Sequence, residues 1–147
     1  AAGSGNEALE LAADTLVTDS TNGTNNGAQF LSEADSLIWN SSSAGSGIIT
    51  ITSGTFNIAS GETITAGSVT LDGGTLAGLG TVAGSVIANN TSTVAPGFSP
   101  GILNTGDLTL NTGSTLSIEI GSALAAISSS RSRQAGSAAM IASEYDT

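Results

Sequence analysis

The chain has 147 residues, of which 83 are Gly, Ser, Thr or Ala, and it carries 12 acidic residues against two arginines, for a formal charge of −10. Clustered Lys and Arg are needed to bind phosphate backbones, so we expect no nucleic-acid partner. The chain also has no lysine, histidine or cysteine. Their absence excludes a thiol nucleophile, disulfide bonds, a zinc site with N/S ligands, a serine–histidine pair and a lysine base.

The length fits one domain, and its core must be aliphatic, because 39% of the residues are apolar and only 3% are aromatic. No run of about 18 apolar residues occurs in the sequence, so we expect no insertion into a membrane. The chain opens with Ala1-Ala2-Gly3 instead of Met. We therefore interpret it as an excised or processed piece of a longer protein.

Short segments of alternating apolar residues recur along the chain. They span residues 9–16, 28–37, 49–56, 69–76, 86–94 and 108–116, and their starts lie 19, 21, 20, 17 and 22 residues apart. The mean step is close to 20 residues, which is within the range of solenoid repeats. The sequence therefore predicts a stack of similar turns.

Position-by-position alignment supports this repeat. The first strand position holds Leu9, Ala28, Ile49, Val69, Val86 and Leu108, and the third holds Leu11, Phe30, Ile51, Leu71, Ala88 and Leu110. A hydroxyl residue then precedes an apolar one in the pairs Thr15-Leu16, Ser36-Leu37, Thr55-Phe56, Thr75-Leu76, Thr93-Val94 and Thr115-Leu116. Alternation with a period of two is typical of half-buried strands.

These patterns predict an all-β fold, a right-handed parallel β-helix of about six turns of roughly 20 residues each. Glycines should form the corners, because glycine adopts positive φ without penalty: Gly54, Gly61, Gly67, Gly73, Gly74, Gly78, Gly80, Gly84 and Gly113. A flexible Gly/Ser linker is the alternative, but the regular aliphatic positions argue against it. A leucine-rich repeat has a similar period and lacks support, since no helical return segment is present.

Stacked turns would also place polar residues in columns. Asp72, Asn89 and Asn111 follow the third strand position, so they are expected to bond along the axis or to their own backbone. Asp14 and Asp35 both precede the hydroxyl residue, which would bring two carboxylates about one strand spacing apart. We hypothesise that Asp14 and Asp35, helped by Glu33, bind Ca²⁺ through oxygen ligands. The alternative is that the carboxylates of Asp14 and Asp35 point separately into water.

Four motifs follow one another in the second half of the chain. They read G-T-L-A-G-L-G-T-V-A-G over residues 74–84, V-A-P-G-F-S-P-G-I-L over 94–103, G-D-L-T-L over 106–110 and G-S-T-L-S-I-E-I over 113–120. In this order they resemble the passenger-associated transport repeat of autotransporter passenger domains and related bacterial surface proteins. The resemblance covers about residues 68–120, and the closing Tyr145-Asp146 is similar to the pair that usually opens the family's next turn.

The resemblance implies a right-handed β-helix on the bacterial exterior, with a role in the secretion and folding of a passenger and with no catalytic residues in this element. Residues 1–67 show the repeat but not the motifs. We therefore divide the chain into β-helix turns over residues 1–120, of which 68–120 are transport-repeat-like, and an irregular Ser/Ala-rich excursion over 121–147 that starts a further turn. The two prolines should make 95–101 a protruding loop, with Phe98 pinned to the core.

The expected role is that of a non-catalytic spacer or adhesin stalk in a secreted or surface-displayed bacterial protein. Its partners would be a host-cell or matrix component, or neighbouring copies that associate through open solenoid ends. The alternative is a carbohydrate-active or carbohydrate-binding β-helix, for which Glu10, Asp14, Glu33 and Asp35 are the densest acidic group. Ice binding through Thr-x-Thr rows is disfavoured, because residues 50–52, 63–65 and 91–93 occupy different places in the turn.

Overall fold

The computed structural model describes residues 8–23, 25–97 and 101–119, and every described element is a β-strand. Phe98 and the predicted excursion over 121–147 lie outside these residues. The strands are β1 (Leu9–Leu11), β2 (Thr15–Leu16), β3 (Thr21–Asn22), β4 (Asn25–Asn26), β5 (Gln29–Trp39), β6 (Ser42–Ser43), β7 (Ile48–Ile58), β8 (Thr63–Leu71), β9 (Thr75–Gly78), β10 (Thr81–Ala88), β11 (Thr93–Pro96), β12 (Leu108–Leu110) and β13 (Thr115–Leu116).

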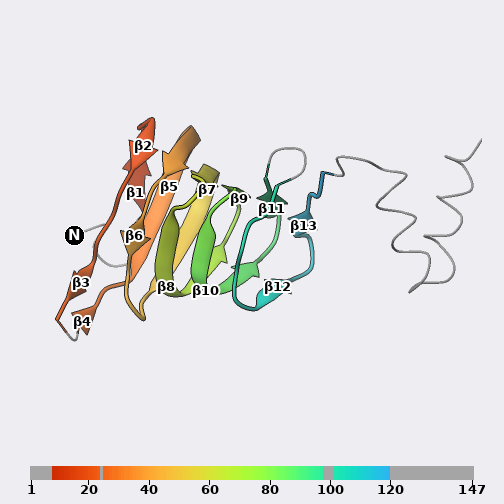
Figure 1. Ribbon diagram of the computed structural model, residues 1–147. Helices are drawn as coiled ribbons and strands as arrows, with labels where there is room; N and C mark the ends of the chain where they lie inside the picture. The colour runs from red at the N-terminus through yellow and green to blue at the C-terminus, as the bar shows by residue number, and fades with distance from the viewer. Residues whose placement is uncertain (1–7, 24, 98–100, 120–147) are drawn as a thin grey trace, which may run out of the picture.

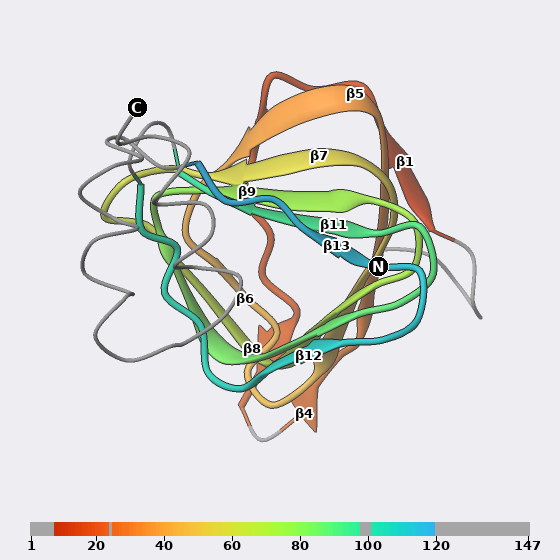
Figure 2. The ribbon, with the colours of Figure 1, turned by 90° about the vertical axis from the view of Figure 1, so that its right-hand side faces the viewer.

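The strands form a coil in which each turn lies beside the preceding one (Figure 1). All pairings are parallel except that of β3 with β4, and the chain makes about five turns, close to the six predicted. Viewed along the axis, the chain winds counter-clockwise as it approaches the viewer towards β13 (Figure 2). The coil is therefore right-handed, as predicted.

Each turn crosses three faces, which we number in chain order. Face 1 contains β1, the first halves of β5 and β7, the second halves of β8 and β10, and β12. Face 2 contains β2, the second halves of β5 and β7, then β9, β11 and β13. Face 3 contains β6 and the first halves of β8 and β10. Long strands such as β5 therefore bend around a corner and serve two faces.

The core consists of columns of like side chains, one residue from each turn. On face 1, Leu31, Ile51, Leu71 and Ala88 are register partners and are fully buried. On face 2, the column runs through Leu37, Phe56, Leu76, Val94 and Leu116, with the hydroxyl column Ser36, Thr55, Thr75, Thr93 and Thr115 beside it. Both predicted face 2 columns are confirmed from the second turn onward.

The predicted alignment of the second turn was wrong by one residue. Ile49 pairs with Gln29 and Ile51 pairs with Leu31, whereas Ala28 and Phe30 were expected in these columns. Because side chains alternate between the two sides of a strand, a shift of one residue exchanges inside and outside. Gln29 is consequently buried, at 1% exposed. Because Gln29 is polar, the sequence alignment did not place it at an inward position.

The first turn is also out of step with the prediction. Leu9 pairs with Leu31, 22 residues later, so this step is longer than the 19 residues expected. On face 2, Thr15 pairs with Ile38 instead of Ser36. The Leu16 side chain therefore stacks on Trp39 and not on Leu37.

Two aromatic rings pack against each other in the core. Trp39 and Phe56 have ring centroids 5.3 Å apart at an interplanar angle of 70°, an edge-to-face contact that aromatic quadrupoles favour. The Trp39 Nε1 donates to Ser42 Oγ at 3.1 Å. Ser42 Oγ also accepts from Thr18 N at 2.8 Å and donates to Asn40 O at 3.0 Å. This buried hydroxyl is therefore satisfied.

The corner glycines serve two different purposes. Positive φ, as predicted, occurs at five of the nine expected positions: Gly54, Gly61, Gly73, Gly78 and Gly113. The explanation was wrong for Gly67, Gly74, Gly80 and Gly84, where φ is not positive and the preceding turn instead leaves no room for a Cβ. The proline segment also differs, because Ala95 and Pro96 belong to β11 and pair with β9.

A column of glycines marks the corner between faces 3 and 1. We call Gly27, Gly47, Gly67, Gly84 and Gly106 the glycine column; each lies two residues before the first inward position of face 1. Gly67 N donates to Gly47 O at 2.9 Å, and Gly106 N donates to Gly84 O at 2.8 Å. From Gly47 onward, an added Cβ would collide with a carbonyl oxygen of the turn before.

Candidate functional site

Glu33 is the one charged side chain buried within residues 8–23, 25–97 and 101–119, at 2% exposed. It lies on β5 two residues after the buried Leu31, so the strand alternation turns it inward. Its Oε1 accepts from Ala34 N at 3.0 Å, whereas Oε2 is buried without a hydrogen-bond partner. Buried carboxylates are normally paired or bonded, so this oxygen distinguishes Glu33 from the other acids described.

Glu33 lines an open groove of about 380 Å³ near the corner between faces 1 and 2. The other lining residues come from three successive turns: Glu10, Leu11, Ser32, Ala34, Ser53 and Gly54. Parallel pairing of β1 with β5 places Glu10 opposite Ser32 and Leu11 opposite Glu33. We call this the Glu33 groove. The side chains of Glu10, Ser32 and Ser53 offer it one carboxylate and two hydroxyls, whereas the Glu33 carboxylate turns inward, on the other side of β5.

The next turn leaves room for Glu33 through a glycine. Gly54, on β7, has φ +81°, and a Cβ there would lie 2.5 Å from Glu33 Cβ and 2.6 Å from Glu33 O. Any other residue at this position would have to displace β5. A glycine predicted for its conformational freedom thus also maintains the space around a buried acid.

Two serine hydroxyls connect the strands at the groove. Ser53 Oγ donates to Glu33 O at 3.1 Å, and it lies 2.6 Å from Ser32 Oγ. A serine has one hydroxyl proton, so with the Ser53 proton on Glu33 O, Ser32 is the donor to Ser53. The lone pairs of Ser32 Oγ then remain available as acceptors.

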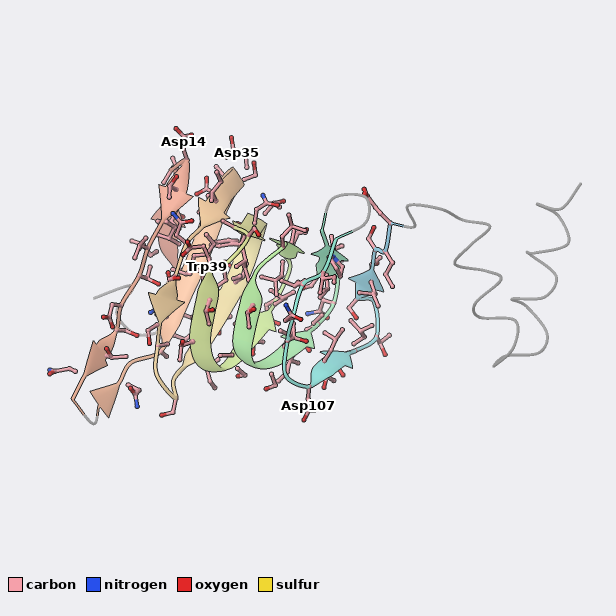
Figure 3. The ribbon with its side chains drawn as sticks, viewed as in Figure 1. Asp14, Asp35, Trp39 and Asp107 are labelled. Atoms are coloured by element: carbon pink, nitrogen blue, oxygen red, sulfur yellow. The ribbon has the colours of Figure 1, made fainter. Side chains whose placement is uncertain are left out.

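The structure does not place Asp14 and Asp35 as register neighbours. Asp14 O accepts from Ile38 N at 2.9 Å, three residues beyond Asp35. Both side chains are exposed and lie at the outer edge of the coil, away from Trp39 (Figure 3). Asp35 Oδ1 accepts from Ser36 N at 2.6 Å. Glu33 therefore shares its groove with Glu10 and not with the two aspartates expected to accompany it.

Gln29 anchors the N-terminal segment to the core. Its Oε1 accepts from Thr18 Oγ1 at 2.7 Å, and its Nε2 donates to Ser20 Oγ at 3.0 Å and to Ser43 O at 3.1 Å. Because these bonds satisfy the buried amide, it costs little to bury. Sequence reasoning missed this residue, although Gly27 two positions earlier is the signal that marks an inward position.

Two exposed carboxylates have pKa values below the ordinary range. The hydroxyl of Thr21 donates to Asp19 Oδ1 at 2.6 Å and the Thr21 N donates at 2.8 Å, and these bonds lower the pKa of Asp19. The hydroxyl and the N of Ser41 donate to Glu62 Oε2 at 2.6 Å and 2.7 Å, which lowers the pKa of Glu62. Asp19 thus closes a local turn, whereas Glu62 connects its turn of the coil to the preceding one.

The predicted polar column on the outside of the coil is confirmed. Asn89 Nδ2 donates to Asp72 Oδ1 at 3.0 Å, and Asn111 Nδ2 donates to Asn89 Oδ1 at 2.6 Å. The Thr-x-Thr rows lie on three different faces, as expected: 50–52 on face 1, 63–65 on face 3 and 91–93 at the start of face 2.

Among the described residues, no three His, Cys, Asp or Glu side chains come together as a metal-binding group. The part of the chain that the structure describes also contains no helix with the length and hydrophobicity needed to cross a bilayer. Comparisons with protein-family models, with curated proteins and with solved structures found no match. Function must therefore be inferred from the right-handed β-solenoid itself and from the buried carboxylate oxygen of Glu33.

Proposed function

We propose that this chain is a non-catalytic structural segment of a secreted or surface-displayed bacterial protein, in which it acts as a spacer or stalk and assists export and folding. The observation that supports this most directly is the continuous stacking of like residues in the columns of faces 1 and 2. Each turn contacts mainly its neighbours, so turns can be added one after another from one end.

The surface of the coil agrees with this role. The described acidic side chains other than Glu33 lie on the outside or are at most half-buried, and the formal charge of −10 favours solubility of an extended body. The resemblance of residues 68–120 to the transport repeat supports a location on the bacterial exterior and a role in export. The proposed partners of such a stalk are host-cell or matrix components.

Location is tested on intact cells of the source organism. Antibodies raised against the purified chain should label these cells without permeabilisation, and proteinase K added outside should remove the signal. An intact cytoplasmic protein measured in the same lysates controls for leakage. Labelling that appears only after permeabilisation would contradict the proposal.

The spacer role is tested by removing one whole turn from the parent protein. Deleting residues 67–83 removes one segment from each face and joins Ala66 to Gly84, which keeps the glycine column intact. Export should be retained, whereas deleting residues 67–75 should abolish it, because later segments would then reach the wrong face. Equal export of both variants would contradict a role of register in export.

The non-catalytic character is tested separately by incubating the chain with acidic and neutral glycans. No reducing sugar should be released above the level of a heat-denatured sample. Release that the Glu10→Gln variant abolishes would instead establish the carbohydrate-active alternative, since hydrolysis of glycosides requires a pair of carboxyl groups.

A further inference from the structure

We propose that Asn22 is a site of spontaneous deamidation, in which the backbone nitrogen of Gly23 displaces the side-chain amide as ammonia and water then opens the ring. The sequence contains two Asn-Gly pairs, Asn22-Gly23 and Asn26-Gly27. The structure leaves the first pair free and holds the second. The inference rests on this difference, and it holds whether or not the chain is a surface stalk.

The reaction closes a ring between the main chain and the side chain. The Gly23 nitrogen attacks Asn22 Cγ, a new N–Cγ bond forms, the Cγ–Nδ2 bond breaks, and the Gly23 N–H proton leaves with the amide as ammonia. Water then adds across one of the two carbonyl–nitrogen bonds of the ring, which gives an aspartyl or an isoaspartyl residue at position 22. Ring closure needs a nitrogen that can approach Cγ, and glycine has no side chain to hinder this approach.

The first pair lies at an exposed turn. Asn22 and Asn25 are the last register pair of the β3–β4 hairpin, a two-stranded sheet separate from the sheet of the coil (Figure 1). Asn22 and Gly23 are both exposed, and Gly23 has φ +61°, as tight hairpin loops require. Neither the Asn22 side chain nor the Gly23 nitrogen has a hydrogen-bond partner among the described residues. This pair is therefore free to cyclise.

The second pair is held at both reacting groups. The Gly27 nitrogen donates to Ser20 O at 3.1 Å, and Ser20 Oγ donates back to Gly27 O at 2.7 Å. The Asn26 side chain donates from Nδ2 to Ser46 Oγ of the next turn at 2.9 Å. Reaction at Asn26 would have to break the bond of the attacking nitrogen and that of the amide. The same dipeptide is thus protected four residues further along the chain.

A third pair, Asp72-Gly73, is prone to the same ring closure, with water as the leaving group. Here the Gly73 nitrogen donates to Ser92 Oγ at 2.8 Å, and Ser92 is fully buried. The sequence has no other Asn or Asp directly before a glycine. Of the three pairs, only Asn22-Gly23 has an attacking nitrogen without a partner among the described residues.

The modification would stay outside the coil. Either product carries one more negative charge than asparagine, and the isoaspartyl product lengthens the main chain of the turn by one methylene. Because β3 and β4 form a sheet of their own, the core columns keep their contacts. We therefore expect the modified chain, separated by anion exchange, to have the melting temperature of the unmodified chain.

The test is incubation of the whole chain at mildly alkaline pH, followed by cleavage before aspartate and mass spectrometry with electron-transfer fragmentation. Cleavage before Asp19 and Asp35 gives residues 19–34, which contain both Asn-Gly pairs. The exchange of NH2 for OH is thus measured at both asparagines in one peptide. We expect Asn22 to react at least about tenfold faster than Asn26, since two hydrogen bonds protect the second pair.

The chain unfolded in guanidinium chloride is the first control. Without the fold, Asn22 and Asn26 should react at similar rates. A difference that persists in guanidinium chloride would overturn the proposal, because local sequence and not structure would then select Asn22. Equal rates in the folded chain, or a folded chain in which Asn22 does not react, would also overturn it.

The Gly23→Ala variant is the second control. It places a Cβ beside the attacking nitrogen and should slow the reaction at Asn22 by about tenfold or more, whereas Asn26 should react as in the wild type. Measuring both rates in guanidinium chloride as well separates this hindrance from any change in the hairpin. Unchanged reaction at Asn22 in the variant would contradict attack by this nitrogen.

Discussion

The Asn89 side chain donates from Nδ2 to Asp72 Oδ1 of the preceding turn at 3.0 Å and accepts from Asn111 of the following turn at 2.6 Å. One amide thus connects three turns on the outside of the coil. Because parallel stacking repeats the same geometry at every turn, each amide can donate on one side and accept on the other.

Replacing Asn89 with Ala should lower the free energy of unfolding by about 1 kcal/mol, since it removes two exposed hydrogen bonds. Urea unfolding followed by circular dichroism measures this. Thr91→Ala, in the same turn, removes an exposed hydroxyl and should change stability by less than about 0.5 kcal/mol. Equal effects of the two variants would show that the column contributes nothing.

Glycines of the glycine column should tolerate alanine only where the neighbouring turn is absent or distant. An added Cβ at Gly84 would collide with Ala66 O, and we expect Gly84→Ala to cost about 1–3 kcal/mol through overpacking. At Gly27, the nearest atom would be Ser20 Cβ at 3.5 Å, an ordinary contact. Gly27→Ala should therefore be neutral or stabilising by about 0.4–1 kcal/mol. Similar losses at both sites would contradict a steric cause.

Trp39 should be the most costly core residue to truncate. Trp39→Ala removes the edge-to-face contact with Phe56 and leaves a cavity, for an expected loss of about 3–5 kcal/mol. Ile38→Ala truncates the neighbouring side chain, which is 49% exposed, and should cost less than about 1 kcal/mol. Thermal unfolding by circular dichroism compares the two. In the wild type, the single tryptophan should fluoresce at a short wavelength until the core unfolds.

Acidification should weaken the contact between Ser41 and Glu62. The pKa of Glu62 is lower in the folded state than in the unfolded state, because the hydroxyl and the N–H of Ser41 donate to its carboxylate. The stabilisation is therefore complete above the unfolded value of about 4.3 and is lost as the pH falls through the lowered folded pKa. Side-chain NMR titration should show the pKa of Glu62 rising in Ser41→Ala, while the pKa of Asp19 stays low.

Whole turns should be removable and half turns should not. The isolated chain that lacks residues 67–83 should still unfold in one cooperative transition at a lower temperature, because each turn contributes its own stability and that of its interfaces. The chain that lacks residues 67–75 should lose its β-sheet signal, since face 2 residues would fall on face 1. A folded half-turn variant would contradict a strict register of the columns.

The sequence predicted the columns correctly where every turn offers an aliphatic residue. Ile51, Leu71 and Leu110 lie in one column, and the hydroxyl column runs from Ser36 to Thr115 as expected. The prediction failed in the second turn, where Gln29 takes an inward place. Spacing from Gly27 would have corrected it, because the glycine two positions before the column recurs in every later turn.

The Glu33 groove could be predicted only in part. Glu33 was recognised as a candidate ligand, but its partner depends on how far the first turn is shifted against the second. That shift is seen where Thr15 pairs with Ile38 and Leu16 with Trp39, and Gln29 holds the same segment through its bonds to Thr18 and Ser20. Such contacts between residues of different turns leave no periodic mark in the sequence.

Parallel stacking also determines how many residues are needed to span a given distance. Neighbouring strands lie about 4.8 Å apart, so a coil of roughly 20 residues advances by only about 0.24 Å per residue, against 1.5 Å in an α-helix. To reach about 100 Å, such a coil needs on the order of 400 residues. In return the cross-section is broad, and each strand between two others is hydrogen-bonded on both sides. The body therefore resists bending. A molecule built this way favours rigidity over economy of chain, and it can be lengthened only by whole coils.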